Sequence, residues 1–203
     1  MSSDDYPVLD SELMYRGKVI SLRRDTLQMG HGKTAVREIV EHLGAVCVVA
    51  IDEDDRVVMV TQYRHAVRAR LDELPAGLLD VGGESPLEGA RRELAEEALL
   101  TADHWQVLVD LYTSPGFSSE AIRVYLARGL HETGRPDGFV VEAEEIHMTV
   151  SRVPLDQAVR RVLEGDITNA AAVAGILAAD VARSTGWSGL RSPDAPWAGQ
   201  PRR

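Results

Sequence analysis

The hydrophobic positions in the first third of the chain alternate with polar ones or form short runs, a pattern typical of β-strands. Short apolar runs between basic positions fill residues 12–29. In residues 34–41, apolar and polar side chains alternate. Residues 44–51 and 56–63 are continuous apolar runs joined by the acidic segment 52–55, whose short polar side chains suit a tight turn. We therefore expect a strand-rich N-terminal region followed by a buried hairpin.

The strongest helical pattern begins at Ser85. Ser85-Pro86-Leu87-Glu88 is a capping box with proline in the first turn, and the helix is predicted to run to about Leu99. Because strands and helices do not alternate regularly, the order of elements favours an α+β fold, with helices packed on the faces of a mixed sheet. The remaining expected elements are helices at 155–163 and 169–183 and strands at 105–112, 122–130 and 146–153.

The length of 203 residues, with 44% hydrophobic residues, fits one globular domain plus a small appendage. We expect residues 1–42 to form the appendage, a small N-terminal antiparallel β-sheet, and residues 43–183 to form the main domain. Residues 184–203 are rich in Gly, Pro and Ser and predict a loosely ordered tail, although Trp187 and Trp197 do not fit that expectation.

The formal net charge of −10 argues against nucleic acid or an anionic membrane as a partner. No apolar stretch approaches the roughly 20 residues that span a bilayer, and the acidic N-terminus is unlike a secretory signal, so we expect a cytoplasmic protein. The single cysteine, Cys47, excludes an internal disulfide and a cysteine-based zinc site. Its apolar surroundings predict a buried strand residue.

Several glutamates gather on one flank of the helix that begins at Ser85. At about 100° per residue, Glu93 and Glu97 lie side by side at the edge of the apolar face, with Glu96 just beyond. Such a flank is either a solvated acidic surface or a site for a divalent cation, because a hard ion such as Mg²⁺ takes oxygen ligands and offsets clustered negative charge.

The segment from Gly77 to Leu100 resembles the Nudix box, GX5EX7REUXEEXGU, in which U is an apolar residue. Two departures stand out: the gap from Gly77 to Glu84 is one residue longer than the pattern, and Leu99 replaces a glycine, which removes a favoured helix stop. The matching residues are Glu84, Arg92, Glu93, Leu94, Glu96, Glu97 and Leu100.

This resemblance implies an α/β/α sandwich and a metal-dependent hydrolase. In the family, the carboxylates matching Glu93 and Glu97 bind Mg²⁺ or Mn²⁺ and serve catalysis, with roughly two to three ions in a site. Glu84 and Glu96 are further candidates, either as ligands or as groups that orient the ligands.

Four further segments resemble the ADP-ribose pyrophosphatase branch of the Nudix superfamily. In that branch the backbone carbonyl at Ala76 completes the metal site, the arginines matching Arg37 and Arg64 contact the nucleotide or its phosphates, and the glutamate matching Glu73 helps to hold substrate. Without the family, the arginines would be read as solvent-facing and 75–77 as a turn. The segments are 37–42, 62–64, 73–77 and 114–120, and the last of them supplies Gly116 and Glu120 as further substrate-binding candidates.

An acidic loop follows Gly134. By itself it reads as a charged surface loop, but in the ADP-ribose branch a loop at this place supplies the general base. We therefore assign Glu142 as the base and keep Glu144 as its rival or as a metal ligand. A glutamate that is not committed to metal can accept the proton of a water whose acidity the metal has raised.

The expected reaction is hydrolysis of the diphosphate of ADP-ribose to AMP and ribose 5-phosphate, with either phosphorus open to attack. The alternatives are another nucleoside diphosphate derivative, such as a nucleotide sugar, NADH or a dinucleoside polyphosphate, and a nucleotide-sensing module without turnover. The resemblance also implies a homodimer in which the N-terminal strands of one subunit pack on the other. A small sheet needs such a cover for its apolar face.

Overall fold

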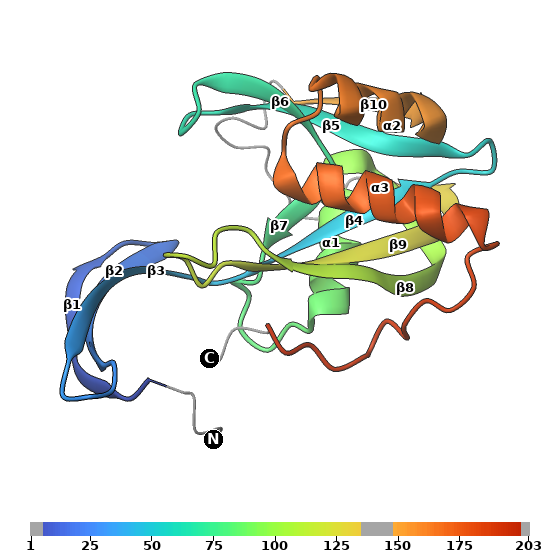
Figure 1. Cartoon of the computed structure of the whole chain (residues 1–203). Helices are drawn as coiled ribbons and strands as arrows, with labels where there is room; N and C mark the ends of the chain where they lie inside the picture. The colour runs from blue at the N-terminus through green and yellow to red at the C-terminus, as the bar shows by residue number, and fades with distance from the viewer. Residues whose placement is uncertain (1–5, 135–147, 200–203) are drawn as a thin grey trace.

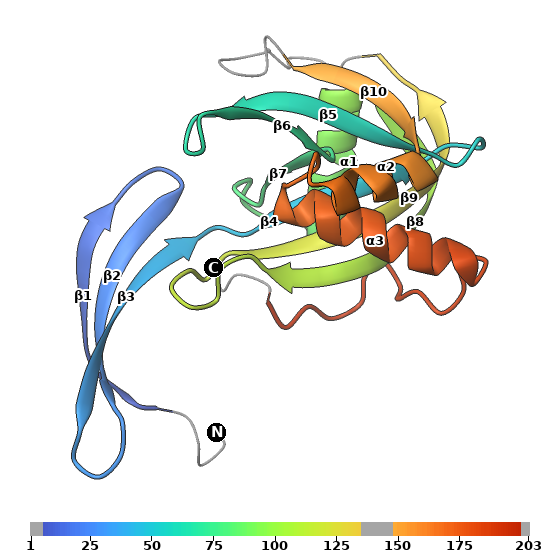
Figure 2. The ribbon, with the colours of Figure 1, turned by 45° about the horizontal axis from the view of Figure 1, so that its top comes forward.

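The computed structural model describes residues 6–134 and 148–199, which form two separate sheets and three helices (Figures 1 and 2). This arrangement confirms the predicted α+β class, with a small antiparallel sheet beside a larger mixed one. None of the described helices is long and apolar enough to span a membrane.

The small sheet contains the first three strands in sequence order, all antiparallel. These strands are β1 (Val8–Arg16), β2 (Ile20–Gln28) and β3 (Thr34–His42). Figure 2 shows this sheet projecting from the main body, which it joins through the end of β3. Every residue of β1 is exposed, so the described part of this chain leaves that strand uncovered.

The main sheet has the strand order β10-β5-β4-β9-β8 and is mixed, because β4 runs parallel to β9 while the other pairs are antiparallel. Two short strands extend it, since β6 pairs with β5 and β7 pairs with β4. The strands are β4 (Ala45–Ile51), β5 (Arg56–Arg64), β6 (Ala69–Glu73), β7 (Ala76–Leu78), β8 (Leu100–Tyr112), β9 (Ala121–Glu132) and β10 (Thr149–Pro154).

Helices cover both faces of the main sheet, as expected for an α/β/α sandwich. Helix α1 (Pro86–Ala98) packs on one face, and α2 (Leu155–Glu164) with α3 (Ala170–Ser184) packs on the other (Figure 1). All seven residues of β4 are buried, because its alternate side chains enter the two cores. Cys47 lies in this strand, where burial raises the pKa of its thiol.

Two features between residues 44 and 83 differ from the prediction. The strands β4 and β5 follow each other around a tight turn, but their only register pair is Ile51 with Val57, so they diverge instead of forming a long hairpin. The segment 71–83, where no strand is predicted, contains the end of β6 and all of β7. These strands are short and lack clear alternation, which leaves little periodic signal.

Helix α1 begins and ends as its sequence suggests, despite the missing glycine. Ser85 and Glu88 form both hydrogen bonds of the capping box. At the other end, Leu99 adopts the left-handed conformation, with φ of 56°, that glycine favours at this position. For a residue with a Cβ this conformation costs roughly 1–2 kcal/mol. The departure from the family pattern is therefore accommodated by backbone strain at one residue.

Residues 185–199 differ from the loosely ordered tail predicted for 184–203. They cross the outer edge of β8, where the amide of Val107 donates to the carbonyl of Arg191 at 3.0 Å. Beyond this crossing, the buried Arg123 side chain donates to the carbonyls of Ala195 and Pro196 at 2.7 and 3.1 Å and lies over the Trp197 ring. We call residues 185–199 the C-terminal strap.

Candidate active site

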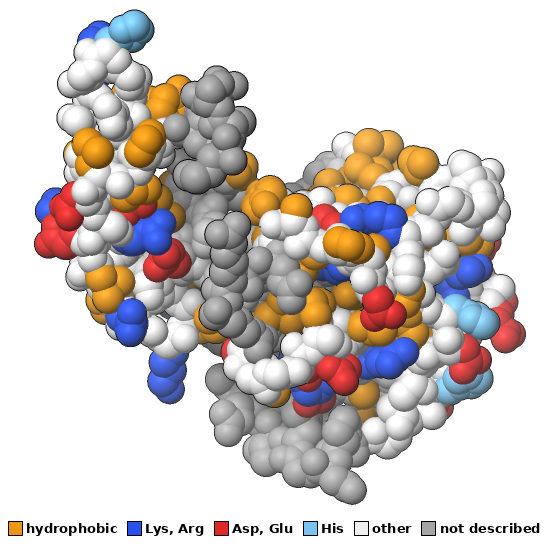
Figure 3. Space-filling view, turned by 90° about the horizontal axis from the view of Figure 1, so that it is seen from below, with side chains coloured by type: hydrophobic (Ala, Val, Ile, Leu, Met, Phe, Trp, Pro, Cys, Tyr) orange, Lys and Arg blue, Asp and Glu red, His pale blue; other side chains and the backbone are white. Residues whose placement is uncertain are grey.

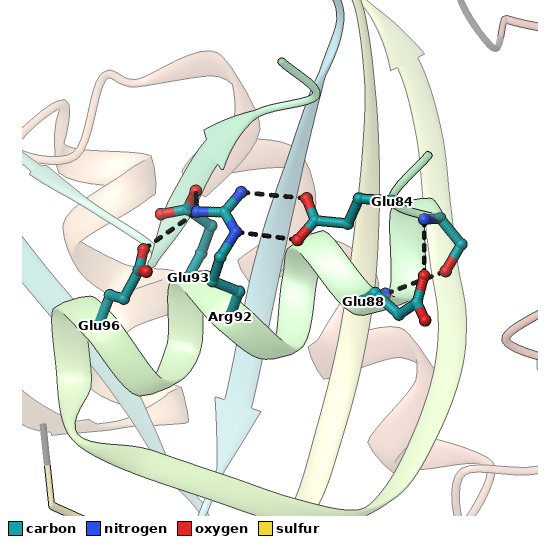
Figure 4. A network of polar contacts seen from close by, with 6 residues as sticks. Glu84, Glu88, Arg92, Glu93 and Glu96 are labelled. Carbon is teal, nitrogen blue, oxygen red and sulfur yellow. Dashed lines mark hydrogen bonds and ion pairs between the residues drawn. The ribbon is translucent and has the colours of Figure 1, made fainter. Parts of the chain in front are cut away.

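Arg92 joins three acidic side chains along the flank of α1, as Figure 4 shows. Its Nε and Nη2 donate to the two carboxylate oxygens of Glu84 at 2.9 and 3.2 Å. Its Nη1 donates to Glu93 at 2.6 Å and to Glu96 at 3.0 Å. The predicted acidic cluster therefore exists in space, and one guanidinium organises it.

The cluster carries more negative than positive charge. The hydrogen bonds to Glu84 raise the pKa of Arg92, and the nearby Glu93 acts in the same direction, while burial opposes them. Arg92 is thus a permanent cation that offsets one charge among Glu84, Glu93 and Glu96. These three carboxylates are largely withdrawn from solvent, with side chains 12–15% exposed, so water screens the remaining negative charge poorly.

The acidic flank of α1 contacts strand β7. The amide of Ala76 donates to the Glu97 carboxylate at 2.9 Å. The Glu93 carboxylate lies directly on Gly77, where an added Cβ would be only 1.9 Å from its Oε1. A larger residue at position 77 would therefore displace the Glu93 carboxylate from this place. The sequence pattern contained this glycine but gave no reason for it.

A cavity of about 1010 Å³ lies beside this contact and holds most of the predicted site residues. It also contains residues that the sequence reasoning did not single out as candidates, among them Gln62, Asp80 and Asn169. Gln62 falls within the segment 62–64 and Asp80 within 77–100, both of which carried the resemblance, whereas Asn169 belongs to no segment that indicated a site. The predicted residues that line the cavity are Arg64, Glu73, Ala76, Glu93, Glu96, Glu97 and Glu120.

Arg64 is held in this cavity by Glu73. Its Nε and Nη2 donate to the two carboxylate oxygens of Glu73 at 2.9 and 2.7 Å. Glu73 is only 2% exposed, whereas the Arg64 side chain is 45% exposed. Such a bidentate pair fixes the plane of a guanidinium. The geometry therefore makes Arg64 the group within reach of a ligand and Glu73 its support.

Glu120, which lines the cavity, accepts a hydrogen bond from the Thr113 hydroxyl across the base of the 114–119 loop. Gly116 of this loop is exposed and lies outside the cavity. Arg37 is exposed on β3, also outside the cavity, and donates to the Val36 carbonyl. The candidate bases Glu142 and Glu144 lie outside the described residues.

The donor set fits a hard divalent ion. Carboxylates and a backbone carbonyl are the oxygen ligands that Mg²⁺ and Mn²⁺ accept, and the excess negative charge favours a cation. As they stand, no three acidic, histidine or cysteine side chains of the described ranges, 6–134 and 148–199, are grouped closely enough to hold a metal. Arg92 occupies the space between Glu84, Glu93 and Glu96, so their oxygens would have to turn toward an arriving ion.

Residues 33–173 match the NUDIX domain, and the chain belongs to the Nudix family. Among its relatives, an ADP-ribose pyrophosphatase of Mycobacterium tuberculosis is 49% identical over 201 residues, covering 99% of this chain and 95% of the relative. A methanol dehydrogenase activator of Bacillus methanolicus is 34% identical, with 83% and 89% covered. The fold also matches a crystal structure of an ADP compounds hydrolase, with a TM-score of 0.75, 24% identity, and 92% of this chain and 98% of that chain covered.

Gly77→Ala tests the contact between β7 and α1. The added Cβ displaces the Glu93 carboxylate, a flexible side-chain end, so we expect the free energy of unfolding to fall by only about 1 kcal/mol. Affinity for Mn²⁺, measured by calorimetry, should fall at least about tenfold because a proposed ligand is misplaced. Gly82→Ala is the matched control, since an added Cβ there meets nothing within 4 Å. Equal metal affinity in the two variants would contradict this account.

Proposed function

We propose that this protein hydrolyses the diphosphate of ADP-ribose to AMP and ribose 5-phosphate with the help of Mg²⁺ or Mn²⁺. The observation that carries the proposal is the acidic cluster on α1, which opens into a cavity of about 1010 Å³ that also contains an anchored arginine. The 49% identity to an ADP-ribose pyrophosphatase along 99% of the chain supports the choice of substrate.

Glu93, Glu97 and the carbonyl of Ala76 would hold the metal, with Glu96 and Glu144 as further ligands. Glu84 would keep Arg92 in place, because it accepts two of the hydrogen bonds from that guanidinium. When bound, the divalent ions offset the charge of the diphosphate and raise the acidity of the attacking water. A cavity rich in carboxylates would otherwise repel an anionic substrate.

Arg64 would contact the substrate phosphates or the nucleotide. Its bidentate pair with the buried Glu73 reduces the conformational freedom that a flexible arginine would lose on binding. Glu73 would then act by orienting Arg64, with Gln62 as an additional neighbour at 3.4 Å. This differs from direct substrate binding by Glu73, the role implied by the family resemblance.

Glu142 would serve as the general base, with Glu144 as its rival. The carboxylates of α1 are committed to Arg92, to the Ala76 amide or to metal, which makes them poor proton acceptors. A glutamate from a separate loop carries no such commitment and can approach the attacking water.

The protein would act as a homodimer joined through its N-terminal sheet. Figure 3 shows hydrophobic side chains exposed on this projecting sheet, interspersed with charged ones. A second copy would cover them, which a small sheet requires for stability. Arg37, which does not line the cavity of its own chain, would then reach the site of the partner. The exposed apolar residues of β1 are Val8, Leu9, Leu13, Met14 and Tyr15, each 47–59% exposed.

The purified protein should release AMP and ribose 5-phosphate from ADP-ribose when Mg²⁺ is present, and EDTA should abolish the release. Products are identified by mass spectrometry, and a reaction in ¹⁸O-water shows which phosphorus is attacked. A parallel panel contains a nucleotide sugar, NADH and a dinucleoside polyphosphate. Faster turnover of one of these would reassign the substrate, and turnover of none would favour a nucleotide-sensing module.

Glu142→Gln should lower kcat at least about 10²-fold, the scale of general-base catalysis, because an amide cannot accept the proton. Binding of Mn²⁺ and of AMP, measured by calorimetry, should stay close to that of the unmodified protein. Glu144→Gln is the comparison variant: its kcat should fall less, and loss of a metal ligand would appear as weaker binding of Mn²⁺. If the effects are reversed, Glu144 is the base.

Mixing two inactive variants tests whether Arg37 serves the partner's site. Arg37→Ala and Glu97→Gln should each form inactive dimers. After exchange of subunits, about half of the dimers are mixed and one of their two sites is intact, so about a quarter of the activity should return. No recovery, with exchange verified by mass spectrometry, would place Arg37 in the site of its own chain or outside the site.

A further inference from the structure

His42 has no role in the mechanism outlined above, although it lines the same cavity as Glu93 and Glu97. It is the last residue of β3, at the point where the N-terminal sheet joins the main domain. Its side chain is only 12% exposed. A largely buried histidine beside a proposed substrate site requires an explanation in terms of its partners.

The two ring nitrogens of His42 have different partners. The amide of Gly44 donates to Nδ1 at 3.1 Å, so Nδ1 acts as an acceptor. In the neutral ring the proton must then be on Nε2. That nitrogen faces the Oε1 of Glu120 at 3.7 Å. The backbone at Gly44 therefore selects the tautomer that directs an N–H group toward a carboxylate in the cavity.

Glu120 ends a loop that is tied to β3 by its backbone. The amide of Val40 donates to the carbonyl of Phe117 at 2.8 Å, and the amide of Ser119 donates back to the carbonyl of Val40 at 2.9 Å. The amide of His42 also donates to the Ser119 hydroxyl at 3.1 Å. The end of the N-terminal sheet and this loop consequently form one connected unit, with His42 at its inner end.

We propose that His42 is a positioning residue that keeps the Glu120 carboxylate directed into the cavity for contact with substrate. The inference rests on the proposed function and adds a residue to it. The Oε2 of Glu120 accepts from the Thr113 hydroxyl, and its Oε1 faces the His42 Nε2 at 3.7 Å. Without His42, the carboxylate keeps the Thr113 contact but loses the polar group that faces Oε1.

The length of the contact sets the size of the expected effect. At 3.7 Å, Nε2 and Oε1 are farther apart than in a direct hydrogen bond, so the pair interacts by charge and dipole or through a bridging hydroxyl group of water or substrate. Loss of such an interaction should change the binding of substrate more than the chemical step. The expected signature is a raised KM with a nearly unchanged kcat.

Two substitutions distinguish the role of Nδ1 from that of Nε2. The amide of Gln in His42→Gln can place an N–H group near the position of Nε2 but offers no acceptor to Gly44. The amide of Asn in His42→Asn can replace Nδ1 but is too short to reach Glu120. We expect KM for ADP-ribose to rise about tenfold in His42→Asn, which loses the contact with the charged Glu120, and to stay within about threefold in His42→Gln.

Two further variants complete the test. In a protein that already carries Glu120→Gln, His42→Asn should add little to KM, because the carboxylate partner has been removed. His104→Asn, a change on β8 outside the cavity, is the control and should leave KM unaltered. A larger KM for His42→Gln than for His42→Asn, or equal values, would overturn the proposal and leave His42 as the acceptor for Gly44.

The tautomer can be measured independently of turnover. Nuclear magnetic resonance of the protein labelled with ¹⁵N-histidine should show His42 with its proton on Nε2, and His42→Gln identifies its signals. A proton on Nδ1 in the neutral ring would overturn the proposal even if the enzyme is active. If the protein does not hydrolyse ADP-ribose, the kinetic experiment fails for the unmodified protein too, which distinguishes a wrong substrate from a wrong role of His42.

Discussion

The bridge from Arg92 to Glu84, Glu93 and Glu96 is the interaction on which the proposed site depends. Three carboxylates on one helix flank would repel one another, especially where solvent is partly excluded. A planar guanidinium offers donors in several directions, so one cation can hold all three. Because Glu84 precedes the helix, the bridge also links the approach to α1 with its middle turns. Arg92 thereby stabilises an acidic arrangement and leaves it short of positive charge, the condition in which a divalent ion binds.

The packing of α1 on the main sheet places the acidic flank of the helix at the cavity. Ala90 and Leu94 bury the adjoining apolar face of α1 against the sheet, which fixes the rotation of the helix. On the neighbouring side, β7 pairs with the fully buried β4 and brings Gly77 under Glu93. Glu93, Glu96 and Glu97 are therefore carried by a helix, and β7 contacts Glu93 and Glu97. Such support suits a site whose ligands must hold a defined geometry.

The sequence predicted the features that depend on near neighbours. The capping box, the three helices and the grouping of Glu93 with Glu97 follow from helical periodicity and a compact motif. Features that depend on distant partners were not accessible in this way. Glu73 supports Arg64, and His42 faces Glu120, only when distant strands have come together in the folded chain. The positions of Glu142 and Glu144 lie beyond the residues that the structure describes, so their roles still rest on the resemblance.

The C-terminal strap changes how much of the β8 edge is open to other chains. Strand β8 is an edge of the main sheet, and an uncovered edge offers its backbone groups to a strand of another molecule. By bonding to Val107 and inserting Trp197 beside the core, the strap occupies part of that edge with the chain's own backbone. At this edge of the sheet, association with other chains is discouraged, while the N-terminal sheet keeps its apolar side chains exposed. The two ends of the chain thus differ: the C-terminal strap covers part of one sheet edge, whereas the N-terminal sheet leaves β1 uncovered.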